Sequence, residues 1–181
     1  MDFTRYNSLY LGDAIFHYRE NTGSGSKFTA GIYSNTRSRG EFPISEEDQA
    51  EFQRIVSEAF TEEIVKGKRF KVVTSEEADE QTIVMRGVVY DIVSRVPPES
   101  AGRVDTYLAT VGEATLILEF LDGKTAEVLA RVAERGVIGT SMGTVDVTRK
   151  TNRATVIGDV KRWARSAARR LRTALDSAIK G

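Results

Sequence analysis

The stretch GEATLILEFLDGKTAEVLARVAERG, Gly112 to Gly136, decides the fold, because it can form either one long apolar helix or two strands folded back on each other. Thr115 to Leu121 is rich in β-branched and aromatic residues, and the DGK that follows it is a turn signal. A helix here would carry a glycine at its centre and lose about 1 kcal/mol at that position. The stretch therefore predicts a β-hairpin, although Ala126 to Arg135 alone is also an acceptable helix.

Two helices are indicated by apolar residues at helical spacing. The first, from Ser45 to Lys66, has Ser45 as its N-cap, acidic residues in its first turn and Gly67 at its end. The second, from Ile157 to Ile179, carries Trp163 on an apolar face, where we expect it to be mostly buried. The first helix is acidic and the second is basic, so helices lying side by side on one sheet would oppose unlike charges.

Further strands are expected at Phe28 to Tyr33, Arg69 to Thr74 and Thr82 to Val96, the last two joined by the acidic turn SEEADE. The polar, glycine-bearing segment GVIGTSMGTVDVTRKTNRAT predicts a loop. Short connections favour antiparallel neighbours, and two one-sided helices need a sheet face to bury against. We therefore expect an α+β fold with a mostly antiparallel β-sheet and two main helices packed on one face. Residues 1–27 are expected to form an N-terminal arm or edge segment, and residues 28–181 a single α+β domain.

The composition excludes several classes of chemistry. The 26 basic and 26 acidic residues give a formal net charge of +0, so no whole-molecule field attracts nucleic acid or an anionic membrane. The absence of cysteine removes disulfides, thiolate catalysis and Cys-containing zinc sites. No apolar run approaches about 18 residues, the length of a membrane-spanning helix. The first residues lack the layout of a signal peptide, so Met1 is either a native start or stands where an export signal was removed.

The most suggestive catalytic motif is GTSMG, Gly139 to Gly143, which matches the G-x-S-x-G nucleophile elbow with Ser141 as the nucleophile. That elbow needs a strand before it, a helix after it and a histidine further down the chain, whereas the only histidine is His17, upstream. We interpret the motif as a flexible glycine loop and His17 as a packed or surface residue. No catalytic, cofactor-binding or metal-binding residue is therefore assigned.

The strongest local feature is the basic half of the second helix, whose cations could contact phosphates. These cations are Lys161, Arg162, Arg165, Arg169, Arg170 and Arg172. A solvated or ion-paired face is the favoured interpretation, and binding of a polyanion, either nucleic acid or anionic lipid, is the alternative. Because the net charge is zero and the acidic first helix would lie alongside, we expect weak or no DNA binding at physiological salt.

Five segments, taken in order, resemble a known family. They are YNSL, ISEEDQAEFQRIVSEAFTEEI, RFKVVTSEEADEQTIVMRGVVYDI, ATLILEFLDGKTAEVLARVAER and DVKRWARSAARRLRTALD, and they span about Tyr6 to Asp176. Their pattern resembles a bacterial envelope lipoprotein family catalogued as domain of unknown function 3313. The resemblance implies a secreted precursor, lipidated on a cysteine at the start of the mature chain and held at a membrane by that anchor. The present sequence contains no such cysteine, and the family supplies no catalytic residue.

We therefore expect a non-enzymatic bacterial envelope domain with a binding or structural role, whose partner is a protein or another envelope component. The alternatives are a small enzyme that uses scattered carboxylates or Ser141, and polyanion binding through the basic helix. No cofactor is expected, nucleic acid is disfavoured as a partner, and membrane attachment is expected only through the lipid anchor. The expected location is the periplasmic face of the cell envelope at the outer membrane, with the cytoplasm as the alternative.

Overall fold

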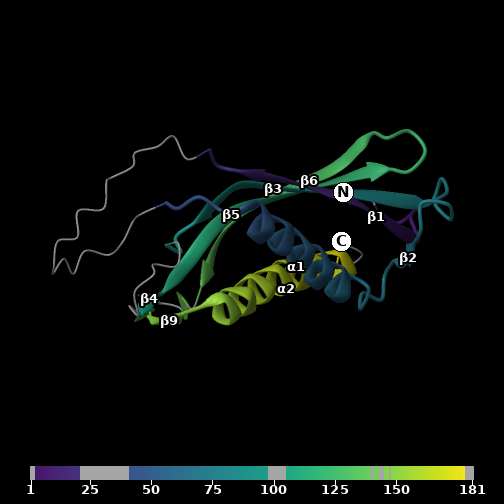
Figure 1. The fold of residues 1–181 in the computed structure, drawn as a ribbon. Helices are drawn as coiled ribbons and strands as arrows, with labels where there is room; N and C mark the ends of the chain where they lie inside the picture. Colours follow the sequence, from purple (N-terminus) through teal and green to yellow (C-terminus); the bar gives the residue numbers. More distant parts are fainter. Residues whose placement is uncertain are drawn as a thin grey trace.

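The computed structural model describes residues 3–20, 41–97, 105–139, 141–142, 145–146 and 148–177 (Figure 1). In this part of the chain a five-stranded sheet is covered by two helices, and short strands form two small ribbons. The elements are β1 (Ser8–Tyr18), α1 (Glu46–Ile64), β2 (Lys71–Val73), β3 (Thr82–Ser94), β4 (Thr106–Leu108), β5 (Thr110–Asp122), β6 (Val128–Gly139), β7 (Ser141–Met142), β8 (Val145–Asp146), β9 (Arg149–Thr151) and α2 (Arg153–Ser177).

The hairpin predicted at the centre of the chain is confirmed, because β5 and β6 pair in antiparallel fashion. Asp122 closes the turn: its Oδ1 accepts hydrogen bonds from the backbone N–H groups of Lys124, at 2.9 Å, and Thr125, at 2.8 Å. Ala126 completes the reversal with a φ of 57°, a left-handed conformation that non-glycine residues rarely adopt. The side chain of one aspartate therefore holds the turn that separates a hairpin from the alternative helix.

The prediction of a mostly antiparallel sheet is wrong, because the main sheet is mixed. Its strand order is β2-β1-β3-β5-β6, in which β1 runs parallel to both β2 and β3, and the other two pairings are antiparallel. β2 and β3 follow each other in the sequence, yet β1 lies between them. β2 is so short that residues 74–81 are enough to bring the chain back to the start of β3. β1 and β2 are joined through α1, the long kind of connection that parallel strands require.

Three other expectations about the strands can be compared with the structure. Ser8–Tyr18, within the segment expected to be an arm or an edge, forms β1 with β2 on one side and β3 on the other. The strand predicted at Phe28 to Tyr33 lies outside the described residues. The loop predicted after β6 is wrong in part, because β7 pairs with β8 and β9 pairs with β4. Polar, glycine-bearing composition did not distinguish these strands from a loop, since β7 and β8 have only two residues each and β9 pairs with β4, which lies elsewhere in the chain.

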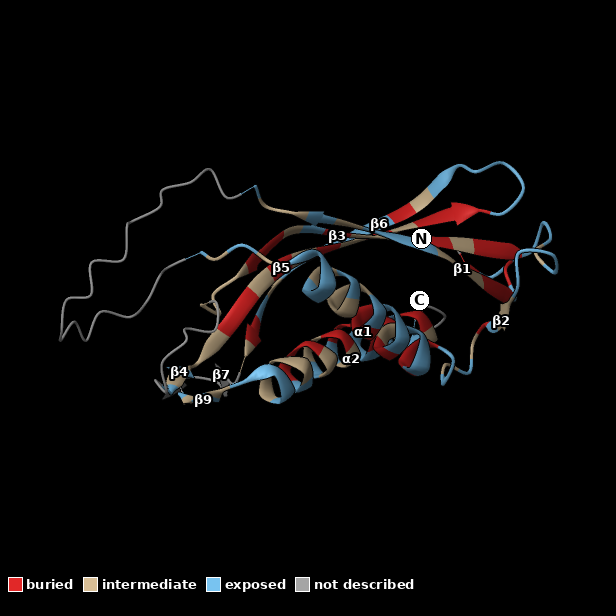
Figure 2. Cartoon of the chain, viewed as in Figure 1, coloured by how far each residue is buried: buried red, intermediate tan, exposed pale blue. Residues whose placement is uncertain are grey.

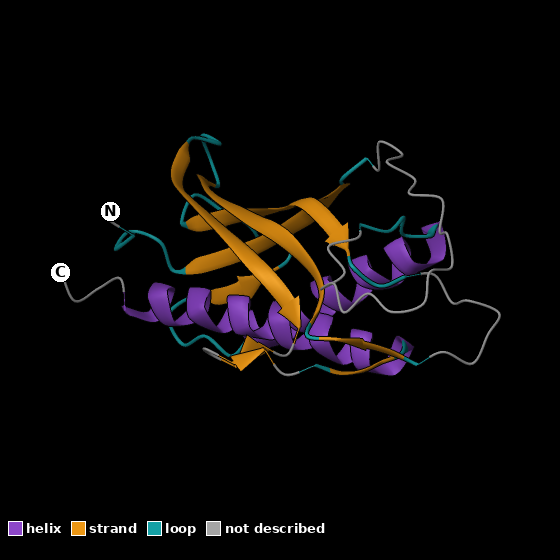
Figure 3. Ribbon diagram, turned by 90° about the vertical axis from the view of Figure 1, so that its left-hand side faces the viewer, coloured by secondary structure: helices purple, strands orange, loops and turns teal. Residues whose placement is uncertain are grey.

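Both helices lie on one face of the sheet, as predicted, and the turned view in Figure 3 shows the same two layers. Ser45 caps α1: its Oγ accepts a hydrogen bond from the backbone N–H of Asp48 at 3.2 Å. At the other end, the N–H of Gly67 donates to the carbonyl oxygen of Ile64 at 2.9 Å. The N-cap predicted at Ser45 is confirmed, whereas the helix ends at Ile64 with Val65 as its C-cap, before the predicted end at Gly67.

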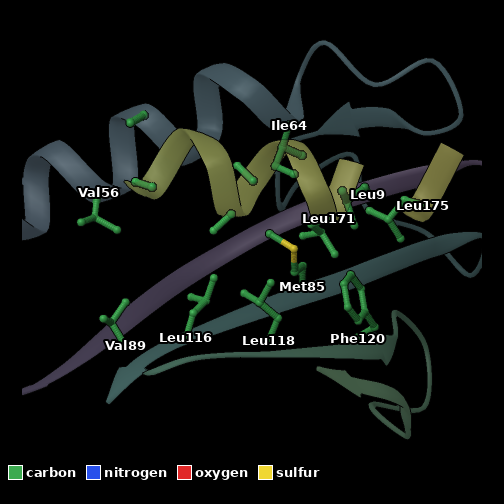
Figure 4. Close-up of a cluster of buried hydrophobic side chains, with 14 of the residues drawn as sticks. Leu9, Val56, Ile64, Met85, Val89, Leu116, Leu118, Phe120, Leu171 and Leu175 are labelled. Atoms are coloured by element: carbon green, nitrogen blue, oxygen red, sulfur yellow. The ribbon is translucent and has the colours of Figure 1, made fainter. Parts of the chain in front are cut away.

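The hydrophobic core fills the space between the helices and this inner face of the sheet (Figure 2). Figure 4 shows Ile64 of α1 and Leu171 of α2 on the side that faces Met85, Leu118 and the neighbouring strand residues. Trp163 is mostly buried, as predicted, but it packs at the rim of this core and keeps some exposure. Its indole lies against Gly136 of β6, so it covers the edge of the sheet instead of its centre.

Candidate functional site

The six cations predicted as a polyanion-binding face lie on α2, and five of them form ion pairs within the chain. The pairs are Arg162–Asp159 at 2.7 Å, Arg165–Glu62 at 2.6 Å, Arg169–Glu63 at 3.3 Å, Arg170–Glu134 at 2.5 Å and Arg172–Glu63 at 3.0 Å. The hydrogen bond from Arg165 lowers the pKa of Glu62, and the charge of the sixth cation, Lys161, lowers it further. The structure thus brings acidic side chains of α1 and β6 to the cations that phosphates would otherwise contact.

Glu63 of α1 is the centre of this arrangement. Its carboxylate is buried, and it accepts hydrogen bonds from Lys66, at 2.8 Å, and from Arg172 and Arg169 of α2. These donors, Lys66 above all, outweigh the cost of burial and lower the pKa of Glu63 to about 2. Glu63 therefore stays ionised across the physiological range and joins the two helices.

A second buried carboxylate, Asp159 of α2, was missed by the sequence reasoning. It is 2% exposed, and it pairs with Arg149 of β9 and with Arg162. The signal was present, because Asp159 falls between Val156 and Val160 in an otherwise apolar stretch of the helix. At the start of α2, Arg153 reaches Glu51 of α1 at 2.8 Å. The expected charge opposition between the helices is confirmed, and it serves to position α2 against α1 and β9.

The residues of the catalytic motif do not have the surroundings that an elbow requires. Ser141 lies in β7, and the next element is the strand β8, whereas a nucleophile elbow leads into a helix. His17 lies on β1 beside Tyr90 of β3, with ring centroids 6.0 Å apart. In the described part of the chain, no group of three or more His, Asp or Glu side chains is placed to hold a metal ion.

A depression of about 210 Å³ lies beside the C-terminal end of β1 and includes Tyr18, Arg19 and Gln49 in its lining. Its polar side chains are already occupied by the protein. The Tyr18 hydroxyl donates to the carbonyl oxygen of Gln49 at 3.0 Å, and Arg19 forms a two-pronged pair with Asp91, whose φ is 57°. These groups stabilise the β-bulge at Asp91, so the depression offers a ligand little polar recognition.

The outer face of the main sheet, which points away from both helices, is the most unusual surface of the described chain. Along β5, the core residues Leu116, Leu118 and Phe120 alternate with outward residues, and the strand register extends this alternation across the sheet. Two apolar rows result. The first contains Val73, Tyr10, Val84, Leu121 and Val128, and the second contains Ile15, Val88, Ile117 and Ala133. Both rows lie where a solvated sheet face would normally carry polar side chains.

Exposure varies along these rows: Leu121 is only 5% exposed, whereas several other outward side chains are well exposed. Ile15 is 56% exposed, Val128 49%, and Tyr90, which lies next to the second row, 54%. A row of charged residues separates the two apolar rows: Arg86 of β3, Glu119 of β5 and Arg131 of β6. Arg131 is bound to Glu119 at 2.9 Å, whereas the exposed Arg86 makes no ion pair with any described residue. The outer face therefore combines apolar surface with one guanidinium that is available to a partner.

The comparisons with known proteins are limited to structural similarity. No family model and no curated protein matches the chain. It is similar to a Helicobacter pylori homolog of a neuraminyllactose-binding hemagglutinin (TM-score 0.46, 13% identity, 95% of this chain and 87% of that chain covered). It is also similar to a Xanthomonas campestris protein of the family called domain of unknown function 330 (0.44, 13%, 92% and 82%) and to a Caulobacter crescentus lipoprotein (0.41, 13%, 72% and 84%).

These TM-scores are all below 0.5, so the similarities assign neither a family nor a function to this chain. Membership of the lipoprotein family that the sequence resembles stays a prediction. None of the helices in the described ranges is long and apolar enough to cross a membrane.

Proposed function

We propose that this domain is a non-enzymatic protein-binding module of the bacterial cell envelope, and that the outer face of its sheet is the contact surface. The single observation that carries the proposal is the pair of apolar rows that the two helices leave uncovered. Large exposed apolar patches on soluble domains usually mark interaction sites, because leaving them in water costs about 25 cal/mol per Å². A protein partner that covers these rows removes that cost.

The partner's chemistry follows from what lies between the rows. Arg86 is exposed and unpaired among the described residues, whereas Glu119 is already bound by Arg131. A partner with apolar side chains around one carboxylate would satisfy both the rows and Arg86. Removing water from an ion pair between Arg86 and a partner carboxylate strengthens the hydrogen bonds between them. The planar guanidinium can donate two such bonds at once, which is why arginine is favoured for binding carboxylates.

Placement in the envelope is supported by the resemblance of the sequence to envelope lipoproteins. In that setting a lipid anchor on a longer precursor would hold the module at the periplasmic side of the outer membrane. The complete gene tests this placement directly. A signal peptide followed by a lipid-modified cysteine upstream of the present chain supports it, and a native start at Met1 rules it out.

The contact surface can be tested by site-specific photocrosslinking in the native host. A benzoylphenylalanine at Tyr90, on the outer face, is expected to give a discrete protein adduct, whereas the same group at Ser57, on the exposed side of α1, gives none. Arg86→Glu should lower the yield of the adduct formed from position 90, because it reverses the charge that faces the partner. Arg54→Glu on α1, whose guanidinium pairs with Glu58 among the described residues, is the matched control. Equal adducts from both probe positions, or no effect of Arg86→Glu, would contradict the proposal.

A further inference from the structure

The edge strand β6 has no partner along its outer side in the described part of the chain. The strand order ends at β6, whose only pairing is with β5. The opposite edge is divided between the three-residue β2 and the part of β1 that continues beyond Tyr10. An edge of twelve residues presents a row of backbone N–H and C=O groups that can pair with another strand. β6 is therefore the longest continuous strand edge in the described part of the chain.

Edge strands are commonly protected by charged side chains, by proline or by bulges. β6 contains no proline, its bulge at Leu129 lies outside the stretch of residues 130–135, and its three central charges are turned back onto their own chain. Arg131 binds Glu119, Glu134 binds Arg170, and Arg135 binds Glu113. In the same stretch Val132 is 46% exposed, although it points to the helix side of the sheet opposite Leu118. The charges that would repel another strand are thus neutralised, and an apolar side chain is left at the edge.

We propose that a second copy of this chain occupies this edge, with the two β6 strands antiparallel and the two-fold axis at Val132. An antiparallel pair of identical strands is closed by a two-fold axis, so it forms a dimer and exposes no new edge. The contact would join two five-stranded sheets into one continuous sheet. It is independent of the proposed outer-face contact, which uses side chains of the sheet face rather than the backbone of its edge.

The charge pattern of β6 selects the register. Directly opposed residues of an antiparallel pair project on the same face, and like charges in such positions are destabilising. A two-fold axis at Arg131 or at Arg135 places that arginine opposite the same arginine of the second copy. An axis at Glu134 places two carboxylates opposite each other, and an axis at Ala133 places Arg131 opposite Arg135. With the axis at Val132, Arg131 faces Ala133 and Ala130 faces Glu134. Of the registers centred between Arg131 and Arg135, this one alone places no like charges opposite each other.

The valine at the axis gives a specific test by sedimentation velocity on the full chain across a wide concentration range. Wild type is expected to show a reversible dimer. Val132→Lys and Val132→Glu should each weaken it by about tenfold or more, because each opposes two like charges at the axis. An equimolar mixture of the two variants should recover the dimer, since lysine then faces glutamate. Val65→Lys, a similarly exposed valine at the C-terminus of α1, should leave dimerisation unchanged.

Because the chain contains no cysteine, single-cysteine variants report the register. Directly opposed residues lie about 4.5–5.5 Å apart between Cα atoms, within the range of a disulfide. Val132→Cys should therefore form a disulfide-linked dimer under mild oxidation. Val137→Cys should not, because in this register Val137 does not face its own copy. The proposal is overturned if the wild type stays monomeric at every concentration, if the Lys and Glu mixture fails to recover the dimer, or if both cysteine variants crosslink equally.

Discussion

Replacing Gly136 by alanine would place a new methyl carbon 2.2 Å from Nε1 of Trp163 and 3.1 Å from its Cδ1. Ordinary contacts between such atoms are about 3.5–4.0 Å, so the indole of α2 would have to move by more than 1 Å from β6. Overpacking of this kind costs about 1–3 kcal/mol. Trp163 lies at the rim of the core with part of its side chain exposed and can shift towards solvent, so we expect a loss of about 1–2 kcal/mol in the free energy of unfolding.

Gly158 offers a matched control for the same chemical change. It lies in α2, and a Cβ added there meets no atom within 4 Å. Gly158→Ala should therefore stabilise the protein by about 0.5–1 kcal/mol, because alanine has a higher helix propensity than glycine. The two glycine-to-alanine changes are expected to have opposite signs, which separates the clash at Trp163 from any general effect of the substitution.

Urea denaturation followed by far-UV circular dichroism measures both effects, and the fluorescence of Trp163, the only tryptophan, reports its movement. In a Trp163→Leu background, the cost of Gly136→Ala should largely disappear, because the smaller side chain leaves room for the methyl group. Unchanged stability and fluorescence in Gly136→Ala would refute the reasoning. An undiminished cost in the leucine background would refute it as well.

Three further predictions concern the helix interface and the basic face. Glu63→Gln should destabilise the protein by about 1–3 kcal/mol at neutral pH, since charged donors lose their carboxylate. Because the pKa of Glu63 is lowered from 4.5 to about 2, this difference should be present above pH 4.5 and shrink as the pH falls towards 2, as followed by urea denaturation at each pH. Trp163→Ala should cost about 2 kcal/mol, less than the about 3–5 kcal/mol of a fully buried aromatic, measured by circular dichroism. Fluorescence anisotropy should detect weak or no binding of DNA at 0.15 M salt, and low-micromolar binding that is lost on changing Arg165 and Arg169 to glutamate would contradict this.

Local patterns in the sequence were sufficient for the elements that depend on near neighbours. The period of the apolar residues identified both helices, Ser45 marked the start of the first, and the Asp-Gly turn after Leu121 predicted the hairpin. The opposite charges of the two helices were also visible, and they do face each other. These features could be read because helix periodicity, capping and turn chemistry act over a few residues.

Tertiary structure alone decided the order and direction of the strands and the ion-pair partners of the charged side chains. Nothing in Ser8–Tyr18 indicates that it lies between β2 and β3, because strand alternation is the same in parallel and antiparallel sheets and the partners are distant in sequence. The same holds for Glu63, whose partners on α2 are more than 100 residues away. A sequence shows which residues can pair, whereas the fold determines which ones meet, because the free energy of pairing depends on contacts that form only when the chain is closed.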